Sequence, residues 1–435
     1  MSTVIFSVGL IIFLAHFFTG LFERTRIPDV FMLMVLGILI GPVLGIIQPQ
    51  DFGQIGKVAT TVALIVILFE GGINLDIKKI KESLDETAYV AISTFIISMF
   101  LVSLAVWGFF KLEPIVAVML GAILGGTTSA VVIPIIQKLK LSDLAYMILF
   151  LESAITDVIC IVVTMSILST YETGHLTTGT ILGQIISSLI LAFIIGFGGG
   201  VIWVAMIKRI KGFPESPVSC LAYIFVLYGI AEFLNFSGAI TALAFGVTLA
   251  NMKDFPVKKI RLQTYFAKFT REEITDYERN FFGDMVFLLK IFFFIYLGVS
   301  IKFGNPDVIL IGFIITVLLF LGRYIIIRFI MPKRVNRNDS RVMSVLIPKG
   351  LAAAVLASIP FQKGIPGGEI VQDIAYMVIL FSIAFAAGLV TSMEKNWLWT
   401  EKICDSIFSV FPKTISTDKS LGQPKVHHNK TKGAR

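Results

Sequence analysis

Carboxylate and hydroxyl side chains stand close together inside a long apolar stretch of this sequence. They are Glu152, Ser153, Thr156 and Asp157. If the stretch is a helix, the spacing of four places Ser153 and Asp157 on one face, with Glu152 and Thr156 on an adjacent face. Carboxylate, hydroxyl and carbonyl oxygens are the ligands that hard cations such as Na+ and K+ prefer. The group therefore predicts a site for a monovalent cation.

Two other apolar stretches carry helix-breaking residues near their centres. Residues 125–129 read Gly-Gly-Thr-Thr-Ser, and residues 348–350 read Pro-Lys-Gly. We expect both stretches to be interrupted helices that expose backbone carbonyls. The alternative is that the glycines allow close packing and the hydroxyls bond to their own helices. The expected cation ligands are Asp157, Ser153, Thr156, Thr127, Thr128 and a freed carbonyl near Thr127.

A carboxylate in a partly dry cavity also attracts a proton, because burial disfavours its charged form. A proton would then compete with the cation for Asp157. One group that binds either ion, and faces each side of a membrane in turn, exchanges one ion for the other. The alternative is that Asp157 is only the structural partner of a neighbouring helix.

Charged residues inside apolar stretches are costly and are therefore candidates for function. The basic ones are Lys290, Arg323, Arg328 and Lys349, and the acidic ones besides Glu152 and Asp157 are Glu70, Glu232 and Asp284. Glu152 can be balanced by Arg323 or by Lys349, and Lys349 suits a structural clamp as well as a charge carrier. We expect Glu70 and Glu232 to be vestibule groups, while the sequence indicates no role for Lys290.

The elements that must position these residues are membrane-spanning helices. The chain has 435 residues, of which 56% are hydrophobic and only 15% charged, and its mean hydropathy is +0.87. Apolar runs of about 20 residues, the length needed to cross a bilayer as a helix, recur from end to end. Thirteen spans are predicted, at residues 4–22, 28–47, 56–74, 87–109, 114–137, 144–169, 178–206, 216–234, 237–252, 281–301, 307–331, 343–362 and 370–394. Residues 1–395 would form one membrane domain, and residues 396–435 a polar, basic tail.

Basic residues favour one orientation of these spans. Alternate loops are rich in lysine and arginine, whereas the opposite loops hold only Lys57, Lys111, Lys302 and Lys363. By the positive-inside rule, the N-terminus faces outside and the tail is cytoplasmic. The two interrupted spans, the fifth and the twelfth, occupy corresponding places in two halves of the chain. This predicts an all-α membrane protein with inverted repeats of six spans (one to six and eight to thirteen), span seven linking them, and the two broken helices crossing at the midplane.

Other classes of function are disfavoured by what the sequence contains. Cys160, Cys220 and Cys404 are too far apart for a disulfide framework or a metal site. His427 and His428 are adjacent, but they lie in the polar tail, which suits a disordered end better than a metal site. The net charge of +8 fits anchoring at the cytoplasmic membrane face rather than nucleic-acid binding. No nucleotide-binding motif, enzyme signature or cofactor site is expected. Met1 is not followed by the basic region of a signal peptide, so the first helix is expected to be retained.

Several short motifs, in this order along the chain, resemble those of one transporter superfamily. They are residues 26–29 (Arg-Ile-Pro-Asp) with 36–42, residues 68–72 (Leu-Phe-Glu-Gly-Gly), residues 231–232 with 237–242 and Gly246, and the pair Gly322-Arg323. Over nearly all of residues 4–395, the chain resembles the monovalent cation/proton antiporter superfamily, nearest the NhaP-like sodium/proton exchangers.

The resemblance implies the NhaA/NhaP-like antiporter fold, in a homodimer with a dimerisation domain and a six-helix core. It implies that Asp157 carries the ion and the proton, with Ser153 and the segment from Thr127 to Thr128 as further ligands. It also implies that Glu152 bridges to Arg323, and that Lys349 stands where relatives often place arginine.

Two departures from the family pattern bear on selectivity. Relatives usually have Asn-Asp or Asp-Asp where this chain has Thr156-Asp157, and Thr-Asp-Pro where it has residues 127–129 (Thr-Thr-Ser). One expected carboxylate is therefore missing.

The function expected from the sequence is exchange of Na+ or K+ for protons in the cell membrane, electroneutrally and through a single carboxylate. One alternative is a cation channel or ion-gated sensor on the same fold, and another is a sodium-coupled solute symporter. The polar groups cluster at the midplane instead of lining a continuous stripe, which disfavours the channel. They are hydroxyls and carboxylates, without the aromatic and amide groups that an organic solute would need. Membrane lipid and a second copy of the chain are the expected partners.

Overall fold

The computed structural model describes residues 2–25, 28–74, 77–139, 141–173, 178–209, 216–234, 236–252, 275–330 and 335–395. The chain divides into two units, Met1–Thr391 and Ser392–Arg435. Of the second unit, only residues 392–395 are described, and they end a long helix. The expected basic tail, with Cys404, His427 and His428, lies outside the described residues.

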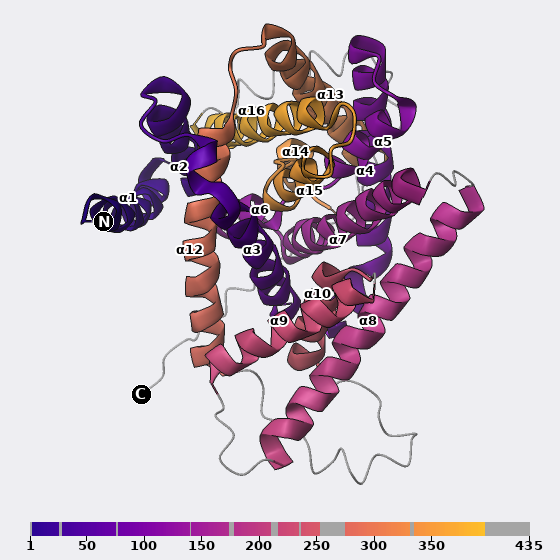
Figure 1. Ribbon diagram of the computed structural model, residues 1–435. Helices are drawn as coiled ribbons and strands as arrows, with labels where there is room; N and C mark the ends of the chain where they lie inside the picture. Colours follow the sequence, from indigo (N-terminus) through magenta and orange to yellow (C-terminus); the bar gives the residue numbers. More distant parts are fainter. Residues whose placement is uncertain are drawn as a thin grey trace, which may run out of the picture. The chain divides into compact units, whose positions relative to one another are not determined.

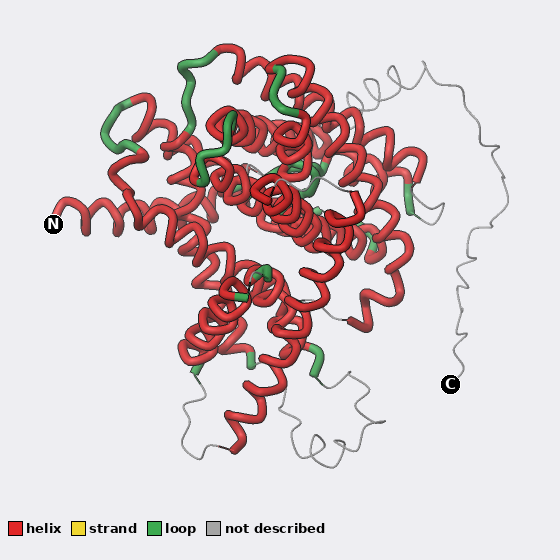
Figure 2. The backbone as a smooth tube through the Cα atoms, turned by 45° about the vertical axis from the view of Figure 1, so that its right-hand side comes forward, coloured by secondary structure: helices red, strands yellow, loops and turns green. Residues whose placement is uncertain are grey.

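Helices connected by short loops make up the described part of the chain (Figure 2). Their bounds are α1 Ser2–Thr25, α2 Asp29–Ile38, η1 Leu39–Val43, η2 Pro49–Phe52, α3 Gly53–Ile73, α4 Ile77–Phe110, α5 Pro114–Ile123, α6 Ser129–Lys138, α7 Asp143–Thr173, α8 Thr178–Arg209, α9 Pro217–Phe233, α10 Gly238–Ala250, α12 Asp276–Ser300, α13 Pro306–Ile330, α14 Arg337–Val345, α15 Leu351–Gln362 and α16 Gly368–Lys395 (Figure 1).

Many of these helices have the length and composition of membrane spans. Among the described residues, six are long and apolar enough to cross a membrane, within α4, α7, α8, α12, α13 and α16. Shorter apolar helices accompany them, in α1, α2 with η1, α3, α5, α9, α10 and α15. Helices make up most of the described residues, and many of them are apolar, which confirms the expected class, an all-helical membrane protein.

Both expected interruptions are present. Helix α5 ends at Ile123 and α6 begins at Ser129, while α14 ends at Val345 and α15 begins at Leu351. Thr128 has extended dihedral angles (φ −100°, ψ 126°), and so the chain leaves the helical conformation between α5 and α6. A milder irregularity occurs where α2 continues into the π-helix η1, which contains Pro42. Proline lacks a backbone donor and crowds the preceding turn, which accounts for the local widening.

Several helices extend beyond the spans predicted for them. Helix α4 begins at Ile77 rather than at residue 87, and α14 begins at Arg337 rather than at residue 343. The sequence-based bounds stop where charged residues begin, because they follow hydropathy. A helix satisfies its own backbone hydrogen bonds and can continue into the polar region outside the hydrocarbon.

One set of helices, termed here the first bundle, consists of α2, α3, α9, α10 and α12. Helix α12 lies against α2 and α3, and α10 lies against α3 and α9 (Figure 1). Glycines bring the backbones close: Gly37 on α2 meets Gly298 on α12, and Gly72 on α3 meets Gly246 on α10. Small residues allow such close contacts between helices in membranes.

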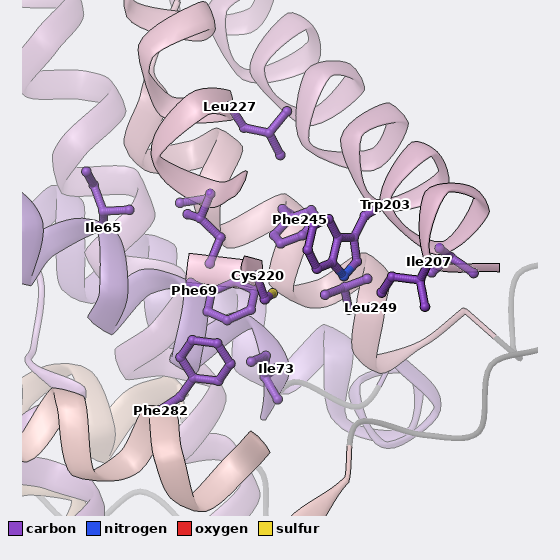
Figure 3. Close-up of a cluster of buried hydrophobic side chains, with 13 residues drawn as sticks. Ile65, Phe69, Ile73, Trp203, Ile207, Cys220, Leu227, Phe245, Leu249 and Phe282 are labelled. Carbon is purple, nitrogen blue, oxygen red and sulfur yellow. The ribbon is translucent and has the colours of Figure 1, made fainter. Parts of the chain in front are cut away.

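An aromatic cluster fills the core of this bundle. Phe69 stacks on Phe245, with ring centroids 5.4 Å apart, and meets the edge of Phe282 at 4.8 Å. Trp203 from α8 and Cys220 from α9 complete the same cluster (Figure 3). Helices α3, α8, α9, α10 and α12 are therefore held together by one apolar core.

The second bundle consists of α4, α5, α6, α7, α13, α14, α15 and α16. Helix α4 packs against α5, α7 and α13, and α14 packs against α7 and α13. Helix α15 contacts α7 and α5 and also reaches α3 and α12 of the first bundle. Helix α8 touches α7 in one bundle and α10 in the other. Both helix interruptions thus belong to the second bundle.

Candidate ion-binding site

The two interruptions meet each other. The backbone N–H of Thr128 donates a 3.0 Å hydrogen bond to the carbonyl oxygen of Pro348. A Cβ placed on Gly350 would lie only 2.5 Å from Oγ1 of Thr128, so only glycine fits this contact. Two segments distant in sequence therefore form one crossing at which helix ends and backbone groups converge.

Lys349, in the second interruption, donates a hydrogen bond back to the first interruption. Its Nζ donates to the carbonyl oxygen of Gly126 at 2.6 Å, and its backbone N–H donates to Oγ of Ser382 on α16 at 3.0 Å. The residue is only 1% exposed. The ammonium group thus lies at the carboxyl end of α5, where a helix dipole favours positive charge. The carbonyl of Gly126, one residue before Thr127, therefore accepts a hydrogen bond from Lys349.

Thr156 holds the interruption that precedes α6. Its Oγ1 accepts a 3.1 Å hydrogen bond from the backbone N–H of Thr127, and lies 3.4 Å from Oγ1 of Thr127. The backbone of Thr156 also leaves no room for a side chain at Gly126. These contacts explain why the chain can leave the helix here, because α7 satisfies a backbone donor that α5 and α6 do not.

Asp157 faces the amino end of α6. Ser129, the first residue of that helix, donates its hydroxyl to Oδ2 of Asp157 at 3.3 Å. The positive end of a helix dipole favours a carboxylate at this position. The side chain of Asp157 is half-buried. One carboxylate is thereby presented beside the crossing of the two interruptions.

The second carboxylate, Glu152, is bound by Arg323. The two guanidinium Nη atoms donate to the two carboxylate oxygens, with Nη2 to Oε2 at 2.7 Å, and both side chains are at most 1% exposed. Arg323 also donates to Oγ1 of Thr94 at 3.0 Å and to the carbonyl oxygen of Met343 at 3.0 Å. This one arginine therefore joins α13 to α4, α7 and α14. Of the two partners that the sequence allowed for Glu152, the structure places Arg323 against it.

Ser153 and Thr128, two of the predicted cation ligands, form hydrogen bonds with partners other than Asp157. Ser153 is fully buried and donates its hydroxyl to the carbonyl oxygen of Phe150 at 2.9 Å. Within the described residues, hydrogen bonds join Asp157 to Ser129 rather than to Ser153 or Thr128. The structure brings Thr127, Thr128, Thr156 and Asp157 together at the crossing, whereas the hydroxyl of Ser153 bonds within its own helix.

Sequence reasoning missed four partners. Ser129 stood within the quoted stretch 125–129, and its place as the first polar residue of a new helix was a usable signal. Thr94, Ser382 and the carbonyl of Gly126 carry no comparable signal, because they are identified only by which helices lie together.

The remaining charged residues lie elsewhere. Lys290, for which the sequence indicated no role, forms an ion pair with Asp29. Glu70 accepts a 2.6 Å hydrogen bond from Asn74, which in turn binds Arg279 at 3.1 Å. Glu232 and Asp284 are exposed. Asp157 and the Glu152–Arg323 pair are therefore the charges gathered with Lys349 around the crossing.

Antiporters from two organisms are similar to this chain in sequence. The chain is 21% identical over 411 residues to the K(+)/H(+) antiporter NhaP of Alkalimonas amylolytica, covering 92% of this chain and 67% of that protein. It is 27% identical over 309 residues to Na(+)/H(+) antiporter 1 of Methanocaldococcus jannaschii, covering 68% of each. The chain thus spans about two thirds of the length of these relatives.

Solved structures show the same fold. The sodium proton antiporter MjNhaP1 from Methanocaldococcus jannaschii at pH 8 superimposes with a TM-score of 0.72 and 22% identity, over 89% of this chain and 99% of that one. Residues 9–394 match the family described as sodium/hydrogen exchanger, transmembrane. These findings confirm the resemblance seen in the sequence motifs. The chain is a multi-pass membrane protein of a transporter family, and it belongs to the sodium/hydrogen exchangers.

Proposed function

We propose that this protein exchanges Na+ or K+ for protons by alternating access, with Asp157 as the group that carries both ions. The observation that carries the proposal is the position of Asp157 beside the crossing of the two helix interruptions. Glu152, the other carboxylate there, is held by Arg323 and is not free to change partners. Asp157 is therefore the acid available to bind a cation or a proton in turn.

The cation is proposed to bind between Asp157 and the oxygens around it. Ser153, Thr127, Thr128 and Thr156 are the proposed further ligands. Thr156 and Thr127 already lie within hydrogen-bonding distance of each other, which supports a compact set of oxygens. The names of the relatives include both sodium and potassium antiporters, so both cations belong in the first assay.

The movement is proposed to be an elevator-like displacement of the second bundle, which holds both interruptions, against the first. Thirteen spans in two inverted repeats, with α8 as the linking span, would give this arrangement. Each predicted span coincides with a helix or an interrupted helix pair, and α8 contacts both bundles, which supports the proposal. The working form is proposed to be a homodimer in the cell membrane. Its N-terminus would face outside, and the tail of residues 396–435 would follow the membrane domain into the cytoplasm.

Proteoliposomes test the function directly. Purified protein is reconstituted into vesicles loaded with a pH-sensitive dye, which are then pulsed with Li+, Na+, K+ or choline. The wild-type protein should alkalinise the lumen when Na+ or K+ enters it, and acidify the lumen when the cation gradient is reversed. Asp157→Asn keeps the shape but cannot carry a proton, so its exchange should fall to the level of empty vesicles.

The same assay separates the alternatives. Cation flux that moves no protons would indicate a channel, and proton-independent uptake of an organic solute with Na+ would indicate a symporter. Full sodium-driven proton movement by a folded Asp157→Asn variant would overturn the assignment of the carrier. Size-exclusion chromatography and a thermal melt establish that the variant is folded.

A further inference from the structure

Each of the two helix interruptions is held by a hydroxyl on the next helix of the chain. In the first interruption, the backbone N–H of Thr127 donates to Oγ1 of Thr156 on α7 at 3.1 Å. In the second, the backbone N–H of Lys349 donates to Oγ of Ser382 on α16 at 3.0 Å. Both hydroxyl residues are at most 1% exposed. Ser382 therefore has the same place beside the second interruption as Thr156 has beside the first.

The two hydroxyls also share their second hydrogen bond. Thr156 donates to the carbonyl oxygen of Ser153, three residues earlier on α7, at 3.3 Å. Ser382 donates to the carbonyl oxygen of Ile379, three residues earlier on α16, at 3.0 Å. Each proton is thus used within the helix, and the oxygen remains available as an acceptor. A buried N–H between two helices lacks the acceptor that a continuous helix supplies, so these hydroxyls satisfy a costly donor.

The N–H that Ser382 binds belongs to the peptide unit between Pro348 and Lys349. The carbonyl oxygen of the same unit accepts the backbone N–H of Thr128 at 3.0 Å. A peptide unit is planar and rigid, so anchoring its N–H also fixes the direction of its carbonyl. The hydroxyl of Ser382 therefore holds one side of a unit whose other side holds Thr128.

The first interruption is built in the same way. In the peptide unit between Gly126 and Thr127, the N–H is held by Thr156 and the carbonyl by the ammonium of Lys349, at 2.6 Å. Each interruption thus contains one peptide unit that is bound on one side by the following helix and on the other by the opposite interruption. The crossing depends on two hydroxyl anchors, of which Ser382 lies outside the predicted cation ligands.

We propose that Ser382 is a positioning residue for cation binding, which holds the peptide unit of Pro348 and Lys349 and, through it, Thr128. The inference rests on the proposed function, since it takes Thr128 as a ligand of the transported cation. It goes beyond that function by making α16 a support of the site. Ser382 acts through the backbone and does not itself touch the cation.

Loss of this hydroxyl should weaken cation binding without slowing transport. Ser382→Ala should raise the KM for Na+ and for K+ about three- to tenfold, the effect of one hydrogen bond between neutral groups. Its maximal rate should stay at the wild-type value, because α16 and both interruptions belong to the second bundle and are displaced together. A merely structural hydroxyl would behave differently, since a loss of folded protein lowers the maximal rate and leaves KM unchanged.

Two further substitutions at the same position test the role of the acceptor. Ser382→Thr keeps the hydroxyl, and Thr156 shows that a threonine on a helix can form both hydrogen bonds. Its KM should therefore match the wild type. Ser382→Cys fills the same space with sulfur, which is a weak acceptor, so KM should rise less than in Ser382→Ala. This variant keeps the test decisive if Ser382→Ala does not accumulate.

Thr316→Val is the matched control. It removes a fully buried hydroxyl that donates to the carbonyl of Gly312 on its own helix at 2.8 Å. Its KM and its maximal rate should equal the wild-type values. All variants are reconstituted into proteoliposomes at equal protein content, and initial rates are measured over a range of Na+ or K+ concentrations. Thermal melts of the purified proteins check that each is folded.

The outcomes separate this inference from the proposed function. A wild-type KM for Ser382→Ala would overturn the inference, and so would a lower maximal rate at unchanged KM, or an equal rise of KM in Thr316→Val. In each of these cases, exchange by the wild type and its loss in Asp157→Asn would leave the proposed function intact. If the wild type moved no protons with any cation, the proposed function itself would fail.

Discussion

Lys290 on α12 forms an ion pair with Asp29, the first residue of α2, with 2.7 Å between Nζ and Oδ2. The other oxygen, Oδ1, accepts the backbone N–H of Val30 at 2.9 Å, so the carboxylate also satisfies the start of its helix. The two side chains are 14% and 7% exposed. The pair therefore closes a contact between two helices that also meet through Gly37 and Gly298.

Breaking this pair should destabilise the protein without changing the ion site. Lys290→Met or Asp29→Asn alone leaves one buried charge without a partner, at a cost of about 3–5 kcal/mol. The double variant should recover much of that loss. The measurement is the melting temperature of the purified protein, with the KM for the cation measured beside it.

Lys302 provides a matched comparison. It pairs with Glu369 at 2.5 Å, but both side chains are more than half exposed. Lys302→Met should therefore cost only about 0–1 kcal/mol. If Lys290→Met melted no lower than Lys302→Met, the buried pair would not be the stabilising contact inferred here.

The Glu152–Arg323 pair should behave as a structural clamp of the second bundle. Glu152→Ala or Arg323→Ala should lower stability by about 3–5 kcal/mol, because each strands a fully buried charge. Arg323→Lys should fall between them and the wild type, since lysine keeps the charge but loses the two-pronged contact. A double neutral replacement, Glu152→Gln with Arg323→Gln, should regain part of the loss in a thermal melt. Single variants that melt like the wild type would show that the pair does not hold these helices.

Neighbouring glycines on α3 should respond oppositely to alanine. A Cβ on Gly72 would clash with the backbone carbonyl of Leu243 on α10, whereas a Cβ on Gly71 would meet no atom within 4 Å. Gly72→Ala should therefore cost about 1–3 kcal/mol, because α10 must shift. Gly71→Ala should be neutral or stabilising by up to about 1 kcal/mol, because alanine favours the helix. Thermal melts that rank the two variants the other way would contradict the close contact of α3 with α10.

Exchange should be electroneutral, with one cation for one proton. Thr156 and Thr128 cannot titrate, and Glu152 is bound to Arg323, so Asp157 is the proposed single carrier. Binding one cation then displaces one proton, and no net charge crosses the membrane. The measurement is proteoliposome exchange under an imposed voltage, together with currents on a solid-supported membrane. No sustained current should appear.

Lys349 is the residue to examine if a current is found. Its ammonium is fully buried against the carbonyl of Gly126, and it is a further titratable group, besides the bound Glu152, at the crossing with Asp157. A current that reverses at the voltage of a two-proton exchange would refute the single carrier. Lys349→Gln would then be the first variant to test.

Much of the fold could be predicted because the bilayer imposes it. Apolar runs identify the helices, and residues 125–129 and 348–350 identify the interruptions, since glycine and proline act locally on the backbone. The bounds of α4 and α14 were predicted less well, because hydropathy reports the hydrocarbon boundary and not the end of a helix.

The candidate site could be predicted only in part. Asp157 and Glu152 were evident as carboxylates in an apolar stretch, but nothing local decides that Glu152 binds Arg323 or that Lys349 reaches Gly126. Those pairings depend on the packing of helices distant in sequence. The ion pair of Lys290 with Asp29 was missed for the same reason.

The crossing of the two interruptions has a consequence for how the protein is made. Lys349 and Gly126 are 223 residues apart, and the chain is synthesised from its N-terminus. When α5, α6 and α7 enter the membrane, the carbonyl of Gly126 and the N–H of Thr128 have no partners from the second interruption. They must be hydrated or sheltered until residues 348–350 emerge from the ribosome. The nascent first half is therefore an incomplete membrane structure, and chains that stop before this point cannot form the crossing.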